Sequence, residues 1–245
     1  MLFLHGWGVD GRIWRQQYKY FSEHYQTIVV DLPGHGKSSW AHVSLERMTQ
    51  DIYALLDYLK ILKTGIVGSS FGGLVGLKMF SLQPSRVSFL VSVGSQPKFI
   101  NDSQYLFALD QERVNKLADQ LSTNYPSMVQ IFFRSLFTRE ERSSRRFRWI
   151  QAFRQNEDIP SREALLGVLD ILKKEDLREV LSQISIPFQW INGAEDYICS
   201  KDLGGYLKEK IPHAQIHLFE KCGHFPFLTK PHEFNQVVEK FLEKL

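Results

Sequence analysis

Gly68-Ser69-Ser70-Phe71-Gly72 is the stretch of this sequence that decides the fold, because it fits the G-x-S-x-G pattern of a nucleophile elbow. The apolar run 63–67 before it is typical of a buried strand, and the run 73–80 after it is typical of a helix. Such a sharp turn forces Ser70 into strained backbone angles and lifts its hydroxyl above the sheet. The pattern is short, so a glycine-serine turn without chemistry is the alternative that the remaining sequence has to decide.

The length and composition are those of one ordinary α/β domain. The chain has 245 residues, of which 43% are hydrophobic and 23% charged. No stretch has the apolar core of a signal peptide or the roughly 18 apolar residues of a membrane span. We therefore expect a cytoplasmic monomer without a membrane or nucleic-acid partner. Cys199 and Cys222 are too few for a disulfide framework and lack metal-site spacing, so no metal and no cofactor are expected.

Segments with strand-like and helix-like patterns alternate along much of the chain. Strands are predicted at 2–4, 27–31, 63–67, 87–93, 187–191 and 214–219. Helices are predicted at 45–61, with Ser44 as the N-cap, at 73–80 and at 232–245. This alternation predicts an α/β fold with a mostly parallel sheet that helices cover on both faces.

One long segment interrupts the alternation. Helical patterns occur at 114–121, 128–137, 146–153 and 162–172, without a convincing strand among them. We interpret 96–183 as a helical lid inserted into a core formed by 1–95 and 184–245. Lids of this kind exclude water and shape the substrate pocket.

A serine nucleophile needs a base, and the base needs an acid that orients it. In hydrolases with this elbow, the order along the chain is serine, acid, histidine. His224 follows the last predicted strand and precedes the apolar Phe225-Pro226-Phe227, which makes it the candidate base. Asp196 follows the preceding strand with the spacing G-x-x-D and is the candidate acid, with its neighbour Glu195 as the rival.

Acyl transfer also needs donors for the oxyanion. One candidate is the backbone N–H of Phe71, the residue after the serine. The other is the N–H of Trp7, in the glycine-flanked loop His5-Gly6-Trp7-Gly8 that follows the first predicted strand. A dinucleotide-binding function is excluded, because no G-x-G-x-x-G follows that strand.

Positive charge is concentrated in one segment. The range 134–154 holds seven Arg, no Lys and two Glu, a local charge of +5, so the remainder of the chain carries 3 − 5 = −2. A solvated helical face is one interpretation of this run, and a docking patch for an acidic partner is the other.

Taken together, LHGWG, DLPGHG, GSSFGG, NGAED and GHFPF resemble the α/β-hydrolase superfamily over the full length of the chain. Within it, the sequence is most similar to the pimeloyl-[acyl-carrier protein] methyl ester carboxylesterases of biotin synthesis. The residues that carry this closer resemblance include Trp14, the run 169–173 with 176–178, the run 186–188 and the run 231–234. The chain begins on the third strand of the usual sheet, so the first two strands are expected to be absent.

The resemblance implies a serine carboxylesterase that cleaves the methyl ester of pimeloyl-acyl-carrier protein. It implies that the ester carbonyl meets Trp7, Ser70, Phe71 and His224. It implies that the acyl chain lies along a lid helix with Phe132, Phe133, Arg134, Ser135 and Leu136. A broad-specificity esterase, or a carbon–carbon bond hydrolase, on the same triad is the alternative, and a non-catalytic ligand-binding homologue is a third.

The resemblance also implies that basic lid residues dock an acidic acyl carrier protein, with Arg142 and Arg146 at matching positions. Arg139 and Arg145 are additional arginines expected to take part. On one continuous helix, Arg142 and Arg146 would share a face with two aromatic residues, and a helix break near 143–144 would resolve this conflict.

Overall fold

The fold is centred on a parallel sheet, seen in a computed structural model that describes residues 1–41, 44–154 and 159–245. Within these residues the sheet has six strands in the order β2-β1-β3-β4-β5-β6, each pair parallel. They are β1 (Leu2–Leu4), β2 (Ile28–Val30), β3 (Thr64–Ser69), β4 (Val87–Val93), β5 (Phe188–Gly193) and β6 (Gln215–Phe219). The predicted α/β class is confirmed, and each strand overlaps a predicted one.

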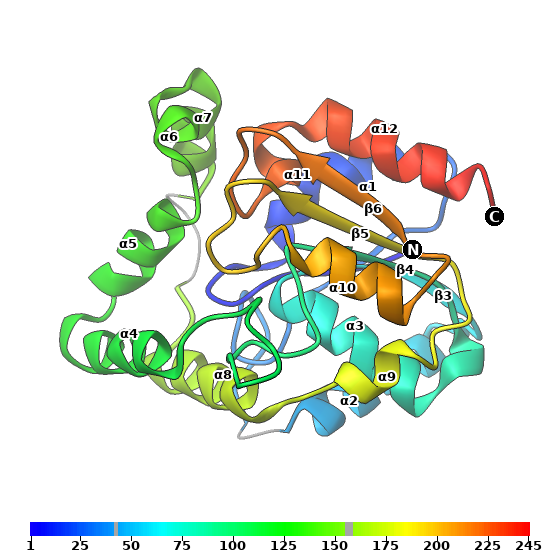
Figure 1. The fold of residues 1–245 in the computed structure, drawn as a ribbon, viewed down its shortest axis with the longest axis horizontal. Coiled ribbons are helices and arrows are strands. Elements are labelled where there is room, and N and C mark those ends of the chain that lie inside the picture. The colour runs from blue at the N-terminus through cyan, green and yellow to red at the C-terminus, as the bar shows by residue number, and fades with distance from the viewer. Residues whose placement is uncertain (42–43, 155–158) are drawn as a thin grey trace.

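Helices cover both faces of this sheet (Figure 1). On one side, α1 (Arg15–Phe21) packs against α12 (Pro231–Leu242), beside the short α11 (Pro226–Thr229). On the other side lie α2 (Leu45–Tyr58), α3 (Phe71–Leu82) and α10 (Leu203–Lys210). Single turns of 3₁₀ helix precede α1 at Gly11–Trp14 and β4 at Pro84–Arg86. The Ser44 hydroxyl accepts from Arg47 N, so the predicted N-cap of α2 is confirmed.

Between β4 and β5 the chain leaves the sheet, and the described residues there form helices and loops but add no strand to the sheet. The helices are α4 (Gln111–Asn124), α5 (Ser127–Ser135), α6 (Arg139–Ser143), α7 (Arg145–Arg154), α8 (Arg162–Lys174) and α9 (Arg178–Leu181). Helices α4 to α7 project to one side of the core (Figure 1). The helix breaks at Ser144, which resolves the conflict between the arginine and aromatic faces. The exact division of the chain at 96 and 183 stays a prediction.

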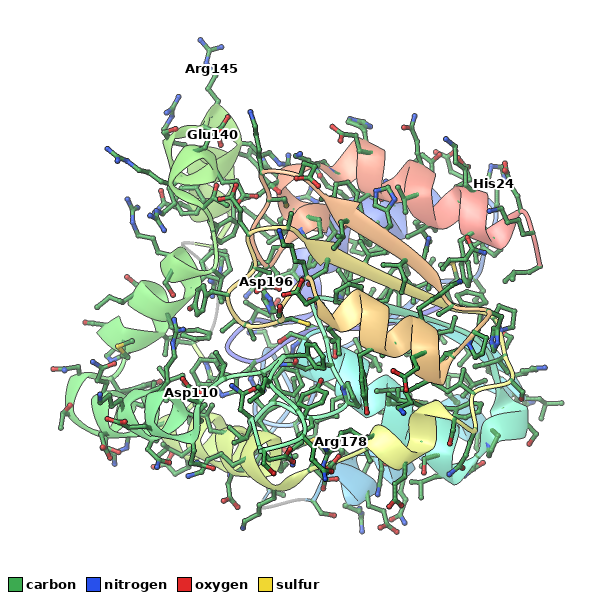
Figure 2. The ribbon with its side chains drawn as sticks, in the orientation of Figure 1. His24, Asp110, Glu140, Arg145, Arg178 and Asp196 are labelled. Carbon is green, nitrogen blue, oxygen red and sulfur yellow. The ribbon has the colours of Figure 1, made fainter. Side chains whose placement is uncertain are left out.

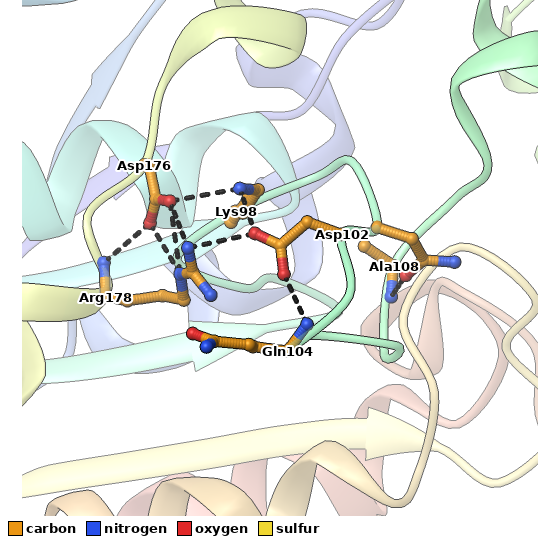
Figure 3. A network of polar contacts seen from close by, with 7 residues as sticks. Lys98, Asp102, Gln104, Ala108, Asp176 and Arg178 are labelled. Atoms are coloured by element: carbon orange, nitrogen blue, oxygen red, sulfur yellow. Dashed lines mark hydrogen bonds and ion pairs between the residues drawn. The ribbon is translucent and has the colours of Figure 1, made fainter.

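A charged network joins the two ends of this helical insertion (Figure 3). Lys98 Nζ lies 2.6 Å from Asp102 Oδ2 and 3.1 Å from Asp176 Oδ2. Arg178 Nη2 lies 3.0 Å from Asp102 Oδ2 and 2.7 Å from Asp176 Oδ2. These ion pairs, which we call the clip, hold the residues at the start of the insertion against those at its end.

Asp176 makes this clip sensitive to acid. Burial acts to raise the pKa of Asp176, but hydrogen bonds from Arg178 and Lys98 outweigh burial and lower the pKa to about 2. Because the folded-state pKa lies below the unfolded value, the stabilisation is fully present above about pH 4 and is lost as the pH falls toward 2.

We predict that Asp176→Asn lowers the free energy of unfolding by about 1 kcal/mol or less at pH 7, since the Asp176 side chain is 34% exposed and solvent screens it. The difference from wild type should shrink as the pH falls from about 4 to about 2. Urea unfolding at several pH values measures it. Asp170→Asn, which removes an exposed pair with Lys174, is the matched control and should cost less. Equal losses in the two variants would contradict a special role for the clip.

Candidate active site

The turn from β3 into α3 places Ser70 in a backbone conformation that side chains rarely adopt. Its φ is 52° and its ψ is −118°. The turn is tight because glycines allow close backbone contact: a Cβ on Gly68 would lie 2.4 Å from Gly72 O, and a Cβ on Gly72 would lie 2.3 Å from Leu4 O. Ser70 N also donates to Val93 O at 2.8 Å, which ties the turn to β4. This is the geometry of a nucleophile elbow.

His224 and Asp196 form a buried hydrogen-bonded pair. His224 Nδ1 lies 2.7 Å from Asp196 Oδ2, so Nδ1–H donates to the carboxylate and Nε2 is left as the basic nitrogen. Asp196 Oδ1 accepts from Ile198 N at 2.8 Å and Cys199 N at 3.3 Å, which fixes the carboxylate. Its neighbour Glu195 is exposed and lies outside this pair. Figure 2 shows Asp196 inside the molecule, between the sheet and the helical insertion.

Ser70 and His224 both line a partly open cavity, whose empty space is about 560 Å³ when the solvent at its mouth is included. Apart from Ser70, His224 and Gly6, its walls are apolar. The apolar lining residues are Trp7, Phe99, Ile100, Leu109, Val114, Leu117, Phe132, Leu136, Leu169, Leu172, Ile198 and Phe225. The core supplies the reactive groups, and α4, α5 and α8 supply much of the apolar wall.

The loop after β1 runs directly beside the serine, since a Cβ on Gly6 would lie 3.1 Å from Ser70 Cβ. Two buried histidines hold this loop. His5 Nε2 accepts from Leu32 N at 2.8 Å, and His35 Nε2 accepts from Gly8 N at 3.2 Å. An accepting nitrogen requires a neutral ring, and burial and the neighbouring His5 lower the pKa of His35 to about 3. The loop therefore keeps this support at neutral pH.

Residues 1–231 match the family described as the alpha/beta hydrolase fold. The chain belongs to the alpha/beta hydrolase fold family. This membership confirms the resemblance read from the ordered motifs, and it agrees with the parallel sheet and the elbow.

Two relatives of this alpha/beta hydrolase carry the same name. A Nitrosomonas europaea protein named pimeloyl-[acyl-carrier protein] methyl ester esterase is 29% identical over 235 residues, which cover 96% of this chain and 92% of that protein. A Salmonella newport protein of the same name is 30% identical over 239 residues, which cover 97% and 91%.

Solved structures share the fold. An esterase from Exiguobacterium antarcticum superposes with a TM-score of 0.89 at 24% identity, covering 99% of this chain and 91% of that one. A bromoperoxidase from Bacillus anthracis gives a TM-score of 0.88 at 25% identity, with the same coverage.

The predicted acyl-chain residues divide between two environments. Phe132 and Leu136 line the cavity beside Ser70. Phe133 is buried against Phe137 and Phe225, with ring centroids 5.0 and 5.6 Å away. Arg134 is exposed, and Ser135 Oγ lies 2.7 Å from Tyr197 Oη. Phe133, Arg134 and Ser135, like the Phe71 side chain, are not among the residues that line the cavity.

The predicted docking arginines also differ in how free they are. Arg142 Nη1 donates to Phe137 O at 2.7 Å. Arg146 Nε donates to Leu228 O at 2.6 Å, and its guanidinium lies over the Trp149 ring. Arg142 therefore supports the lid internally, whereas Arg146 ties the lid to the core helix α11. Arg139 and Arg145 are exposed, and Arg145 points outward at the tip of the α6–α7 pair (Figure 2).

The sequence interpretation missed several wall residues of the cavity, among them Phe99, Val114 and Leu169. The apolar faces of α4 and α8 were the available signal, but periodicity does not distinguish a cavity wall from ordinary core. No group of His, Cys, Asp and Glu in the described ranges could hold a metal ion. None of the helices in those ranges has the length and apolar character to cross a bilayer.

We predict that Gly72→Ala destabilises the fold by about 2 kcal/mol or more, since the new Cβ would overlap the backbone of β1. Gly205→Ala in α10 is the matched control: its Cβ would meet nothing within 4 Å, so the change should be neutral or stabilise by about 0.5–1 kcal/mol. Urea unfolding measures both. Equal stability of the two variants would contradict the tight elbow.

Proposed function

We propose that this alpha/beta hydrolase is a serine carboxylesterase that hydrolyses the methyl ester of pimeloyl-acyl-carrier protein to pimeloyl-acyl-carrier protein and methanol. One observation carries the chemistry: the elbow serine Ser70 and His224, which is paired with Asp196, line the same apolar pocket. The names of the relatives supply the substrate.

In the first half of the reaction, Ser70 Oγ attacks the ester carbonyl while His224 Nε2 takes its proton. Asp196 holds the imidazole through Nδ1–H and stabilises the cation that forms. The backbone amides of Trp7 and Phe71 donate to the oxyanion. His224 then protonates the departing methoxide, so methanol leaves and an acyl-serine remains.

In the second half, a water molecule enters and His224 Nε2 takes its proton as the oxygen attacks the acyl-serine carbonyl. Collapse of the intermediate returns the proton to Ser70 and releases the carboxylic acid. The histidine thus alternates between base and acid, and the net change is the exchange of methoxide for hydroxide on the acyl carbon.

The walls of the cavity favour an ester over its acid product. A methyl ester is neutral and accepts burial among apolar side chains, whereas a free carboxylate pays a large desolvation cost in such surroundings. The apolar walls near Ser70, formed by Phe132, Leu136 and Phe225, therefore suit a masked carboxyl group and promote release of the acid.

The carrier protein is proposed to dock on the lid. Acyl carrier proteins are acidic, and the seven arginines of the range 134–154 would attract one. The exposed guanidinium groups of Arg139 and Arg145 suit this role better than those of Arg142 and Arg146, because Arg142 donates to Phe137 O within the lid and Arg146 donates to Leu228 O of the core helix α11.

We predict that Ser70→Ala abolishes hydrolysis of p-nitrophenyl acetate, because the nucleophile is lost, while the circular dichroism spectrum stays unchanged. Ser69→Ala is a matched control, since Ser69 is its buried neighbour at the end of β3 and should leave activity largely intact. Turnover by Ser70→Ala at the wild-type rate would exclude the proposed mechanism.

We predict that reversing charge at Arg139 and Arg145 together to Glu raises KM for the carrier-bound methyl ester about ten-fold or more at low salt, since steering falls with charge. KM for free dimethyl pimelate should not change. Lys63→Glu, an exposed charge reversal on the core, is the control. A wild type that prefers the free ester would instead support the broad-specificity esterase.

A further inference from the structure

The loop that carries His224 is held from the lid side through its backbone. His224 N donates to Leu136 O at 2.9 Å, and Gly223 N donates to Glu141 Oε2 at 3.0 Å. A Cβ on Gly223 would lie 2.4 Å from Leu136 O, so the lid turn 136–141 is pressed directly against this loop. The partners Glu141 and Gly223 are 82 residues apart in sequence.

Glu141 is an unusual residue for such a place, because it is a carboxylate with only 8% of its surface exposed. Its Oε2 accepts from Thr138 N at 2.8 Å, and its own N–H donates to Thr138 Oγ1 at 3.0 Å, which forms a capping box at the start of α6. Oε1 is buried, and no hydrogen bond to it occurs within the described residues.

Capping alone does not account for this burial. A capping box works as well with an exposed glutamate, whereas burying a carboxylate costs several kcal/mol unless hydrogen bonds offset it. Here the second donor to Oε2 is Gly223 N, the amide directly before His224. Burial and the charge of Glu141 also raise the pKa of Cys222, which places the carboxylate beside a further residue of the same loop.

The lid turn itself has a fixed position. Phe137 packs against Phe225, the residue after His224, with ring centroids 5.6 Å apart, and against Phe147 of α7 at 4.9 Å. Arg142 Nη1 donates to Phe137 O at 2.7 Å. These contacts hold the turn in place independently of Glu141, so a side chain on the turn can fix the position of the histidine loop.

We propose that Glu141 is a positioning residue for His224. It couples the packing of the lid turn 136–141 against the core to the position of the His224 imidazole. Its carboxylate fixes Gly223 N, and through that amide it fixes the backbone from which the imidazole projects. This inference rests on the proposed function, in which His224 is the base. When the turn 136–141 moves away from the core, the histidine loop loses both lid hydrogen bonds, so the site is fully assembled only under a seated lid.

The test compares Glu141→Gln and Glu141→Asp with the wild type. Glutamine keeps an oxygen at the same reach without the charge, whereas aspartate keeps the charge but is one methylene too short for Gly223 N. With p-nitrophenyl acetate, Glu141→Asp should lower kcat about ten-fold or more with little change in KM, and Glu141→Gln should stay within about three-fold of wild type. Rates are referred to the amount of folded protein measured by circular dichroism.

Thr138→Ala is the matched control for stability. It removes the hydroxyl that accepts from Glu141 N but leaves the contact between Glu141 Oε2 and Gly223 N. It should lower the melting temperature as a lost cap does, with kcat close to wild type. The proposal is overturned if kcat falls as far in Thr138→Ala as in Glu141→Asp. It is also overturned if kcat falls as far in Glu141→Gln as in Glu141→Asp.

Hydrogen exchange gives a readout that does not depend on turnover. The peptide around 220–227 should exchange faster in Glu141→Asp than in the wild type, and at the wild-type rate in Glu141→Gln. Unchanged exchange in Glu141→Asp overturns the positioning role. If the wild type hydrolyses no ester while Glu141→Asp still exchanges faster than the wild type, the result contradicts the proposed function and leaves the contact between Glu141 and the histidine loop supported.

Discussion

The backbone of Ser70 is the constraint on which the site depends. Its positive φ is held because β1, β3 and α3 approach so closely that only glycine fits at 68 and 72. Strain of this kind persists only where surrounding packing over-determines it. Once the serine is fixed at the carboxyl edge of the parallel sheet, the loops after β1, β5 and β6 meet it there, since all six described strands end at that edge.

The insertion between β4 and β5 does more than cover the cavity. Trp7 Nε1 donates to Leu165 O at 2.9 Å, and the Trp7 ring meets Phe132 edge-on with ring centroids 4.9 Å apart, so α8 and α5 both contact the loop after β1. Tyr197, next to the acid, contacts Ser135. With Glu141 at the histidine loop, each loop of the site has a lid contact. Each of these hydrogen bonds contributes only about 1 kcal/mol to stability.

The sequence correctly predicted the elements that depend on interactions between residues close together in the chain. The buried run Val87–Val93 is a strand at its predicted bounds, and Ser44 caps α2, because apolar periodicity and capping are properties of neighbouring residues. Helix α10 was missed because its sequence LGGYLKEK is short and has two glycines in its first turn, which lower helix propensity. The conflict between charged and aromatic faces suggested a break near 143–144, but the sequence alone did not show it, and only the structure places it at Ser144.

In the site, too, the sequence predicted the residues that belong to local motifs but not the contacts between distant parts of the chain. Motif order predicted the elbow and the residues around it, and the structure brings Asp196 and His224 into contact. Thr138-x-x-Glu141 could have been read as a capping box, but nothing local shows that the carboxylate also reaches Gly223 N. The inward roles of Arg142 and Arg146 depend on carbonyls at Phe137 and Leu228 that only the folded chain brings near.

The central claim is that one serine, held in the elbow, is the nucleophile. Its most direct measurement is peptide mass spectrometry after reaction of the wild-type protein with a fluorophosphonate. The account predicts a single adduct on Ser70, with Ser69 and Ser95 unlabelled although both are buried nearby. An adduct on a different serine, or none in fully folded protein, would contradict it.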